Sequence, residues 1–277
     1  MPWAGFWIAS PQIRQSALKV LLGIARVRTH PCCQPSLSLD PLAAVLITGA
    51  SRGIGAAAAR AFGRAGYRLL LVARSSADFQ QLEEELAAAG ATVYSTCLDL
   101  SDAAAIGPAI QELCQRGGSP DVVINNAGAA YTGALAAMSL ERWQWLMQLN
   151  LTSVFQVCQV VLPMLRQNGQ GLVINVSSHA ARNAFPDWGA YCTSKAALNA
   201  FSRCLATEER SHGIRVSTLT LGAVNTPLWD SESVDSSFDR HAMLDANRAA
   251  EALLYIAQQP ATQVVEDLTL MPAAGVL

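Results

Sequence analysis

Charged side chains are scarce in this chain of 277 residues. Asp, Glu, Lys and Arg make up 14% of the residues and apolar residues 51%, against roughly 25% and 45–50% in typical globular domains. The formal net charge of −2 excludes a strongly basic surface, so we expect no nucleic acid among the partners. The low charge density predicts much buried surface, which includes subunit interfaces.

Cysteine patterns typical of metal or redox sites are also missing. The number of cysteines is odd, and no Cys-x-x-Cys pair occurs. We therefore expect reduced thiols in a cytoplasmic protein, with no disulfides and no metal site. No apolar run approaches the roughly 20 residues needed to cross a bilayer, so we expect no membrane as a partner. The cysteines are Cys32, Cys33, Cys97, Cys114, Cys158, Cys192 and Cys204.

Residues 1–43 differ in composition from the rest of the chain. Arg14, Lys19, Arg26 and Arg28 stand against a single acid, Asp40. An Arg-bearing, acid-poor leader is typical of a transit peptide. The alternatives are a poorly ordered extension or a start codon placed too early, and we favour these over a transit peptide. Residues 44–277 contain neither an internal linker nor a repeat, and we expect them to form one domain.

Strand-like and helix-like segments alternate from residue 44 onward. Short runs rich in Val, Ile and Leu, such as "AVLITGA" and "GLVINVSS", are separated by stretches with helical spacing. This alternation predicts a parallel sheet that helices cover on both faces. Right-handed crossovers then make it a doubly wound α/β fold of the Rossmann type with about seven strands. The helices are predicted at residues 54–66, 78–89, 102–116, 140–167, 190–211 and 246–258.

A glycine-rich turn follows the first predicted strand. In "TGASRGIG" (residues 48–55), Gly49, Gly53 and Gly55 have the spacing G-x-x-x-G-x-G, which differs from the usual G-x-G-x-x-G of dinucleotide sites. Glycine allows a tight turn and close approach of the backbone to a ligand, and the N–H groups of the helix that begins here face an anion. The segment therefore predicts a loop that binds a pyrophosphate.

The end of the second predicted strand indicates which dinucleotide binds. NAD-binding folds place an acid about 20 residues after the glycines, where it bonds the ribose 2′-hydroxyl. Here that strand ends in "LLLVARSS", with Arg74 and no acid, and Arg52 lies in the glycine loop itself. Two guanidinium groups suit a 2′-phosphate, so we expect NADP(H) as the cofactor. The alternative is that Arg74 is only a solvated charge at the end of a strand.

Three polar residues between 178 and 195 form a candidate catalytic set. Lys195 follows Tyr191 by four residues, so both side chains share one face of a predicted helix. Free Tyr has a pKa of about 10, and a neighbouring ammonium is expected to lower it. Tyr191 could then exchange a proton with a carbonyl or alcohol oxygen, which Ser178 could hold where charge develops. Tyr and Lys at this spacing also occur by chance on many helices, so the pair alone decides nothing.

Taken together, these segments resemble the short-chain dehydrogenase/reductase family. The matching pieces are "TGASRGIG", "LDL" around Asp99, "NNAG" (125–128), Asn150, Ser178 and "YCTSK" (191–195), in the order and spacing of the family. They span the chain from residue 44 to its C-terminus. The resemblance implies a sheet with the strand order 3-2-1-4-5-6-7, and hydride transfer between NADP(H) and a carbonyl or secondary alcohol.

The resemblance also implies roles for individual residues. Tyr191 resembles the acid/base, and Lys195 the residue that tunes it and binds the nicotinamide ribose. Ser178 would polarise the carbonyl, and Asn150 would hold a relay water beside the lysine. The implied cofactor contacts are Gly49, Ser51, Arg52, Gly53, Ile54, Gly55, Arg74, Asp99, Leu100, Asn126, Ala127, Gly128, Tyr191, Lys195, Val224 and Thr226.

Two points qualify this transfer of roles. Asn125 and Asn126 could simply bond strand backbones together. Where the family usually has Pro before Gly222, this chain has Leu221, which restores an N–H that proline lacks. We expect this change to loosen the loop over the nicotinamide without changing the chemistry.

The substrate pocket is expected outside the carboxyl ends of the strands. Its candidate walls are mostly apolar, which favours a neutral or lipophilic carbonyl compound over a small anion. A 3-oxoacyl-thioester reductase is a candidate by its frequency in the family, but no residue here selects it. The polar segment 227–245 has the composition of a mobile lid. The candidate walls are His179, Phe185, Trp188, Leu228 and Trp229.

Assembly and rival functions follow from the same segments. The predicted helices 140–167 and 190–211 carry apolar residues on more than one face, and the resemblance implies that they pack against a second subunit in a homodimer or homotetramer.

One rival to the enzyme function is a non-catalytic NADP(H) sensor or scaffold on the same fold. A sugar-nucleotide epimerase or dehydratase shares the Tyr–Lys pair, but its glycine spacing and larger C-terminal lobe are absent here.

Overall fold

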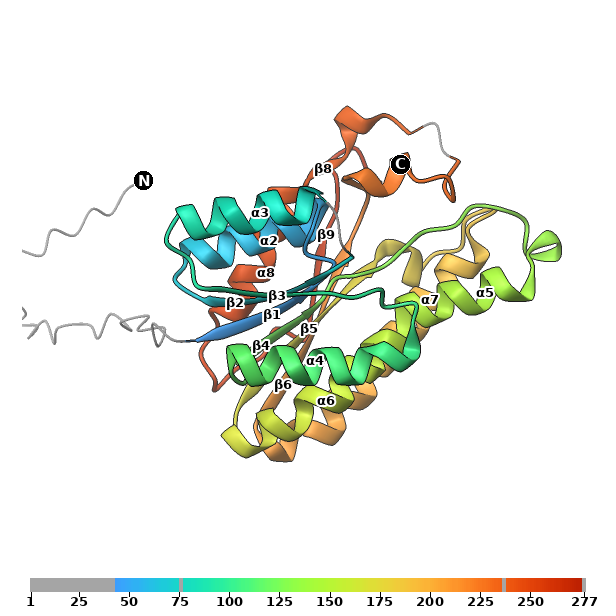
Figure 1. The fold of residues 1–277 in the computed structure, drawn as a ribbon. Coiled ribbons are helices and arrows are strands. Elements are labelled where there is room, and N and C mark those ends of the chain that lie inside the picture. The colour runs from blue at the N-terminus through green and yellow to red at the C-terminus, as the bar shows by residue number, and fades with distance from the viewer. Residues whose placement is uncertain (1–42, 75–76, 236–237, 276–277) are drawn as a thin grey trace, which may run out of the picture. The chain divides into compact units, whose positions relative to one another are not determined.

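A seven-stranded parallel sheet forms the centre of the described chain. The structure is a computed structural model that describes residues 43–74, 77–235 and 238–275, so the predicted extension lies outside it up to residue 42. The strand order is β3-β2-β1-β4-β5-β6-β9, which confirms the predicted fold class and order (Figure 1). The strands are β1 (Ala44–Thr48), β2 (Arg68–Ala73), β3 (Val93–Cys97), β4 (Val122–Asn125), β5 (Gly171–Ser178), β6 (Ile214–Leu221) and β9 (Asp267–Leu270).

Two layers of helices cover the sheet because its central strands are apolar on both faces. Along β1, Val45 and Ile47 pack on one side, and Ala44 and Leu46 on the other. Figure 1 shows α2, α3 and α8 on the first face and α4, α6 and α7 on the second. The helices are α2 (Gly53–Arg64), α3 (Ala77–Ala88), α4 (Ala103–Gly117), α5 (Leu140–Met147), α6 (Ser153–Asn168), α7 (Gly189–Glu209) and α8 (Ala246–Ala257).

The helix predicted at residues 140–167 is not continuous. A π-helical turn, η2 (Gln148–Thr152), separates α5 from α6. Asn150 lies in this turn and is fully buried. π-Helical turns inside α-helices are frequent at functional sites, and this one carries a residue of the candidate set.

The same helical segment also has the length and composition of a membrane span. Leu140–Asn168 is 29 residues long and apolar, and no other described helix passes both criteria. Core helices of soluble proteins pass them too, and α6 packs against α4 in the second core layer. This is weak evidence for a span, and the expectation of no membrane partner stays a prediction.

Leu221 lies inside the sheet and not in a loop. It is the last residue of β6, is 3% exposed, and pairs with Ser178 of β5 and Leu270 of β9. The N–H of Gly222 then donates to the carbonyl of Leu270 at 2.9 Å. Where we expected a looser loop, the structure extends the parallel ladder up to the candidate catalytic serine. The next elements are two short paired strands, β7 (Val224–Asn225) and β8 (Leu244–Asp245).

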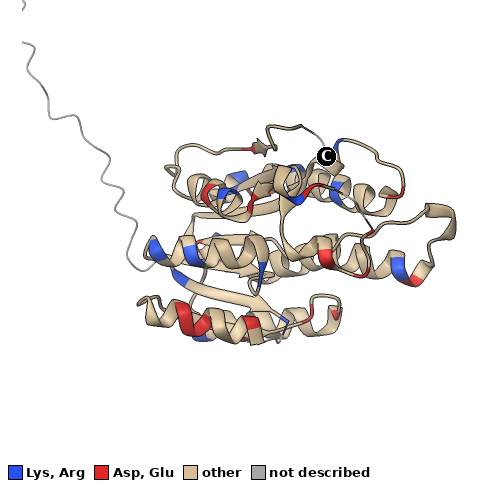
Figure 2. Cartoon of the chain, turned by 90° about the horizontal axis from the view of Figure 1, so that it is seen from above, with Lys and Arg blue, Asp and Glu red and all other residues tan. Residues whose placement is uncertain are grey.

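Charged residues are sparse and of mixed sign over the described ribbon (Figure 2). Several of them form ion pairs between neighbouring elements. Arg60 of α2 bonds both carboxylate oxygens of Glu85 on α3, and Arg166 of α6 bonds the buried Glu209 of α7. These pairs join helices within each layer and lie apart from the candidate site.

Candidate active site

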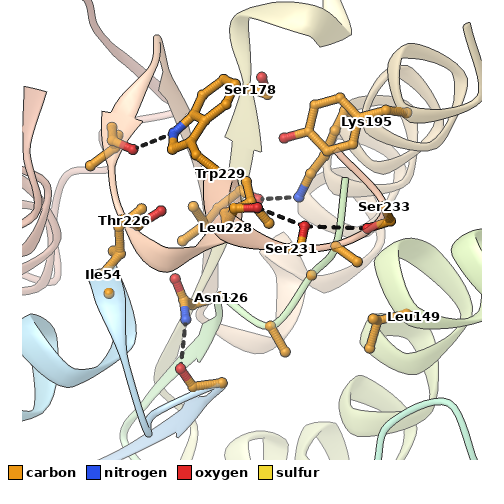
Figure 3. Close-up of a pocket in the computed structure, with 18 of the residues that line it drawn as sticks. Ile54, Asn126, Leu149, Ser178, Lys195, Thr226, Leu228, Trp229, Ser231 and Ser233 are labelled. Atoms are coloured by element: carbon orange, nitrogen blue, oxygen red, sulfur yellow. Dashed lines mark hydrogen bonds between the residues drawn. The ribbon is translucent and has the colours of Figure 1, made fainter. Parts of the chain in front are cut away.

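A single large cavity at the carboxyl ends of the strands brings the predicted residues together. Its volume is about 1020 Å³, and its walls include every predicted site residue except Gly55 and Asn150. Figure 3 shows Ser178 and Lys195 on the same side of this space as Trp229, with Asn126, Ile54 and Thr226 nearer the glycine loop. The cavity therefore joins the predicted cofactor loop to the predicted catalytic set.

The glycine loop leaves no room for a Cβ atom at Gly49 or Gly55. Gly49 and Gly53 have φ angles of +69° and +56°, a region that favours glycine. A Cβ on Gly55 would stand 2.1 Å from the carbonyl oxygen of Gly49, and a Cβ on Gly49 would stand 2.8 Å from the Cα of Ala127. Gly55 is thus packed behind the loop, while Gly49, Ser51, Arg52, Gly53 and Ile54 line the cavity. The loop fits the cradle expected for a pyrophosphate.

Asn126 joins the end of β4 to this loop. Its Nδ2 donates to the carbonyls of Thr48 at 2.9 Å and of Gly49 at 3.2 Å, and its own N–H donates to the Thr48 hydroxyl. Asn126 therefore does bond strand backbones together, which was the alternative to a cofactor contact, and it also lines the cavity. Asn125 bonds Asn175 on β5 instead, at 2.9 Å, and does not line the cavity.

Two arginines and one acid line the cavity near the glycine loop and the end of β2. Arg52 and Arg74 are exposed, and neither forms an ion pair with another described residue. Burial raises the pKa of Asp99, but hydrogen bonds from Ser101 and the positive charge of Arg74 outweigh it, and the net pKa is lowered. Asp99 is therefore held as a carboxylate next to an unpaired guanidinium.

Ser178, Tyr191 and Lys195 converge on the cavity from β5 and α7. The Lys195 ammonium lies 5.9 Å from the centre of the Tyr191 ring and donates to the carbonyl of Val176 at 3.0 Å. The Ser178 oxygen accepts from the N–H of Ala180 at 3.1 Å, and the Ser178 hydroxyl bonds the side chain of Tyr191. One helical turn thus places the tyrosine and lysine side by side, as their spacing predicts.

The pKa of Tyr191 departs from our expectation in direction. Burial raises it, and although a hydrogen bond from Ser178 acts to lower it, the net pKa stays above its ordinary value. Burial lowers the pKa of Lys195 from 10.5 to about 8, and that side chain is 6% exposed. The expected lowering of the tyrosine pKa is therefore wrong for this structure, because burial raises the pKa and Lys195 is not among the groups that shift it.

Asn150 acts behind the cavity wall. Its Oδ1 accepts from the N–H of Ala129, and its Nδ2 donates to the carbonyl of Ala129 and to the Ser194 hydroxyl. Ser194 in turn donates to the carbonyl of Tyr191 at 2.8 Å. A Cβ on Gly128 would be 3.1 Å from Asn150 Oδ1 and 3.6 Å from Lys195 Nζ. Gly128 therefore lies close to both side chains.

The predicted substrate walls all line the cavity, together with residues that sequence reasoning missed. The missed residues include the charged Arg142 and Glu232. Arg142 lies 5.3 Å over the ring of Trp145. No local motif marks the missed positions, because they come from α5 and from the segments after β4, β7 and β9. The other missed residues named here are Tyr131, Trp145, Phe238 and Met271.

The segment predicted as a lid is hydrogen-bonded to the segment after β4. The Ser233 hydroxyl donates to the carbonyl of Ala130 at 2.8 Å, and its own carbonyl accepts from the N–H of Thr132 at 2.9 Å. The N–H of Asp235 donates to the Thr132 hydroxyl at 2.7 Å. In this conformation the described part of the segment closes one side of the cavity.

Comparison with known proteins agrees with this geometry. The family profile described as short chain dehydrogenase matches residues 43–236. A sepiapterin reductase of Chlorobaculum tepidum is 31% identical over 239 residues, which are 83% of this chain and 96% of that protein. The Bos taurus protein named dehydrogenase/reductase SDR family member 7B is 34% identical over 213 residues. These are 75% of this chain, which spans 65% of the bovine protein's length.

Solved structures show the same fold. The crystal structure of an alcohol dehydrogenase from the archaeon Thermococcus sibiricus, complexed with 5-hydroxy-NADP, superposes with a TM-score of 0.76 at 32% identity. The match covers 84% of this chain and 97% of that one.

Proposed function

The chain belongs to the short-chain dehydrogenase/reductase family, and on this premise we propose that it is an NADP(H)-dependent oxidoreductase that interconverts a carbonyl and a secondary alcohol. The observation that carries the proposal is the one cavity that the glycine loop shares with Ser178, Tyr191 and Lys195. A dinucleotide held by the loop at one end reaches the three polar side chains at the other.

Tyr191 is the acid that protonates the product in our proposal. Its raised pKa keeps the phenol protonated at neutral pH, as an acid for carbonyl reduction must be. The Ser178 hydroxyl bonds the side chain of Tyr191, so a substrate oxygen placed between the two accepts a hydrogen bond from each in our proposal. When bound, the dinucleotide supplies the hydride. Tyr191 gives its proton to the oxygen on which negative charge develops.

Lys195 holds the cofactor ribose and supports Tyr191. One of its N–H groups is used by Val176, and two remain for ribose hydroxyls. With a pKa of about 8 the amine is mostly protonated at neutral pH. Its positive charge then stabilises the phenolate that forms as the proton leaves. Asn150 fixes the Ala129 backbone and the start of α7 around this pair, and the relay-water role implied by the family stays a proposal.

The preference for NADP(H) rests on the two unpaired arginines. Arg52 and Arg74 both line the cavity, and β2 ends at Ala73, directly before Arg74, without an acid at this point. The related structure in complex with 5-hydroxy-NADP supports the same choice. A 2′-phosphate would give these two guanidinium groups the close ion pair that neither forms with a described residue.

The substrate in this proposal is a neutral or lipophilic carbonyl compound. Trp188, Trp229 and Leu228 line the cavity beside the catalytic set. Arg142 and Glu232 also line it and carry charges of opposite sign. A linear 3-oxoacyl thioester is the alternative substrate, and the test below includes it.

Consumption of NADPH at 340 nm with a panel of aldehydes, ketones and one 3-oxoacyl thioester tests the function. We expect turnover by the natural sequence, and a loss of about 10²–10⁴-fold in Tyr191→Phe with unchanged NADPH binding. Turnover that persists in Tyr191→Phe would overturn the proposed acid. NADPH binding without turnover of any carbonyl would instead favour the sensor or scaffold.

We also propose a homodimer or homotetramer in the cytoplasm. Phe155 of α6 is 44% exposed, and its ring lies edge-to-face with that of Phe201 on α7 at 6.5 Å. An aromatic pair with one exposed ring, Phe155, and one partly buried ring, Phe201, on two neighbouring helices suits a subunit interface. Light scattering coupled to gel filtration tests the assembly, with Phe155→Glu expected to shift it toward the monomer.

A further inference from the structure

Four aromatic side chains form a continuous row along the cavity, which we call the aromatic row. Tyr191 and Trp188 have ring centres 5.6 Å apart, Trp188 and Trp229 are 5.8 Å apart, and Trp229 and Phe238 are 5.4 Å apart. The rings are tilted by 71°, 58° and 83°, respectively. All four residues line the cavity, so the row runs from the proposed acid to the segment that closes the site.

The row is held by backbone contacts at both of its tryptophans. The indole N–H of Trp229 donates to the carbonyl of Val224 at 2.8 Å, which uses the only polar atom of that side chain. The carbonyl of Trp188 accepts from the N–H of Cys192 at 2.8 Å in the first turn of α7. The ring of Trp229 therefore offers only its carbon surface to the cavity.

A wall of tilted rings distinguishes ligands by shape as well as by apolar area. Burial of apolar surface favours any lipophilic ligand of equal size. A flat ring gains in addition from edge-to-face or offset contacts, which raise affinity by roughly 2- to 12-fold per aromatic pair. A saturated ring or a linear chain of the same carbon number lacks this second contribution.

We propose that the aromatic row selects carbonyl compounds that carry a flat aromatic ring system near the carbonyl, in preference to linear or saturated-ring ones. The inference rests on the proposed function, because Tyr191 is both the proposed acid and the first ring of the row. A carbonyl placed at Tyr191 has its substituent next to Trp188 and Trp229, so those two rings meet the substituent first and Phe238 meets only larger ones.

Three methyl ketones with equal carbon number test the inference: 4-phenyl-2-butanone, 4-cyclohexyl-2-butanone and 2-decanone. None has a ring conjugated to the carbonyl, so their intrinsic reactivities are matched. We expect kcat/KM for the phenyl compound to exceed that for 2-decanone by about tenfold, with the cyclohexyl compound near 2-decanone. Trp188→Leu and Trp229→Leu should each lower the phenyl-to-decanone ratio by roughly 2- to 12-fold.

Two further sets of variants control the experiment. Trp188→Phe and Trp229→Phe keep a ring and should retain most of the ratio, which separates ring contacts from misfolding. Tyr255→Leu removes an exposed aromatic ring outside the cavity and should leave the ratio unchanged.

The outcomes separate the two proposals. Equal or faster reduction of 2-decanone by the natural sequence overturns the ring preference and leaves the oxidoreductase function standing. So does an equal loss for all three ketones in both leucine variants. Failure to reduce any ketone or aldehyde, despite bound NADPH, overturns the function and the ring preference together.

Discussion

The side chain of Asn150 pairs with both polar groups of the Ala129 backbone. Its Oδ1 accepts from the Ala129 N–H and its Nδ2 donates to the Ala129 carbonyl, each at 2.9 Å. The residue is fully buried in the π-helical turn. One carboxamide thus fixes the chain just after β4, where the cavity wall passes Gly128 and Lys195.

Removal of this carboxamide should destabilise the fold. Asn150→Ala leaves the part-buried N–H and carbonyl of Ala129 and the buried Ser194 hydroxyl without this partner, and such a loss costs about 1–3 kcal/mol for a buried group. We expect the free energy of unfolding, measured in urea, to fall by at least about 2 kcal/mol. Asn168→Ala is the matched control, because Asn168 ends α6 with an exposed hydrogen bond to Ser119, and its effect should stay within about 0.5 kcal/mol. Equal stability of the two variants would contradict the structural role of Asn150.

The Lys195 amine should titrate near pH 8. It is the only lysine among the described residues, and the full chain has one other, Lys19. A pH titration of the two lysine Cε–Nζ signals by NMR therefore resolves it, with Lys195→Met as the assignment control. Because burial lowers its pKa from 10.5 to about 8, we expect the Lys195 midpoint well below that of an exposed lysine. A midpoint near 10.5 would contradict the desolvated environment.

The lowered pKa of Lys195 also determines the direction in which the stability of the fold changes with pH. Between pH 8 and 10.5 the unfolded chain binds more protons at Lys195 than the folded chain does, so this residue's contribution to stability rises with pH. The cost of burying the charge is fully present below pH 8 and disappears by about pH 10.5. The stability of the natural sequence relative to Lys195→Met should therefore increase by up to roughly 3 kcal/mol between pH 7 and 10.5. The buried thiols of Cys114 and Cys158 titrate in both proteins and cancel in this difference.

Cofactor choice should depend on Arg52 and Arg74. Replacement of either by Ala removes a charged donor for the 2′-phosphate, and we expect NADPH affinity to fall by about 10- to 100-fold. NADH lacks that phosphate, so its affinity should change much less. Arg64→Ala is a suitable control, because Arg64 is exposed in the last turn of α2 and does not line the cavity. Equal losses for NADPH and NADH, measured by calorimetry, would show that these arginines do not read the phosphate.

The fold and most of the candidate site follow from local sequence patterns. Apolar strand runs predict the parallel sheet, and a four-residue spacing places Tyr191 and Lys195 together because a helix repeats every 3.6 residues. Phe238 and Arg142 were not predicted as site residues. Tertiary packing brings them to the cavity, and no local sequence pattern marks them. The direction of the Tyr191 pKa shift was also mispredicted, because the burial that raises this pKa depends on the whole fold and not on the local spacing.

Gly55 lies where the glycine loop enters α2, and Gly107 of α4 is a matched helical glycine outside the loop. A Cβ on Gly55 would meet the carbonyl oxygen of Gly49 at 2.1 Å and Asn126 Nδ2 at 2.7 Å, whereas a Cβ on Gly107 would meet nothing within 4 Å. Gly55→Ala should displace the loop, lower the unfolding free energy by about 1–3 kcal/mol and abolish measurable NADPH binding. Gly107→Ala should raise the unfolding free energy by about 0.5–1 kcal/mol and leave NADPH binding intact. Both residues are helical, so normal cofactor binding in Gly55→Ala would mean that the loop does not need the close approach of its backbone that we assign to it.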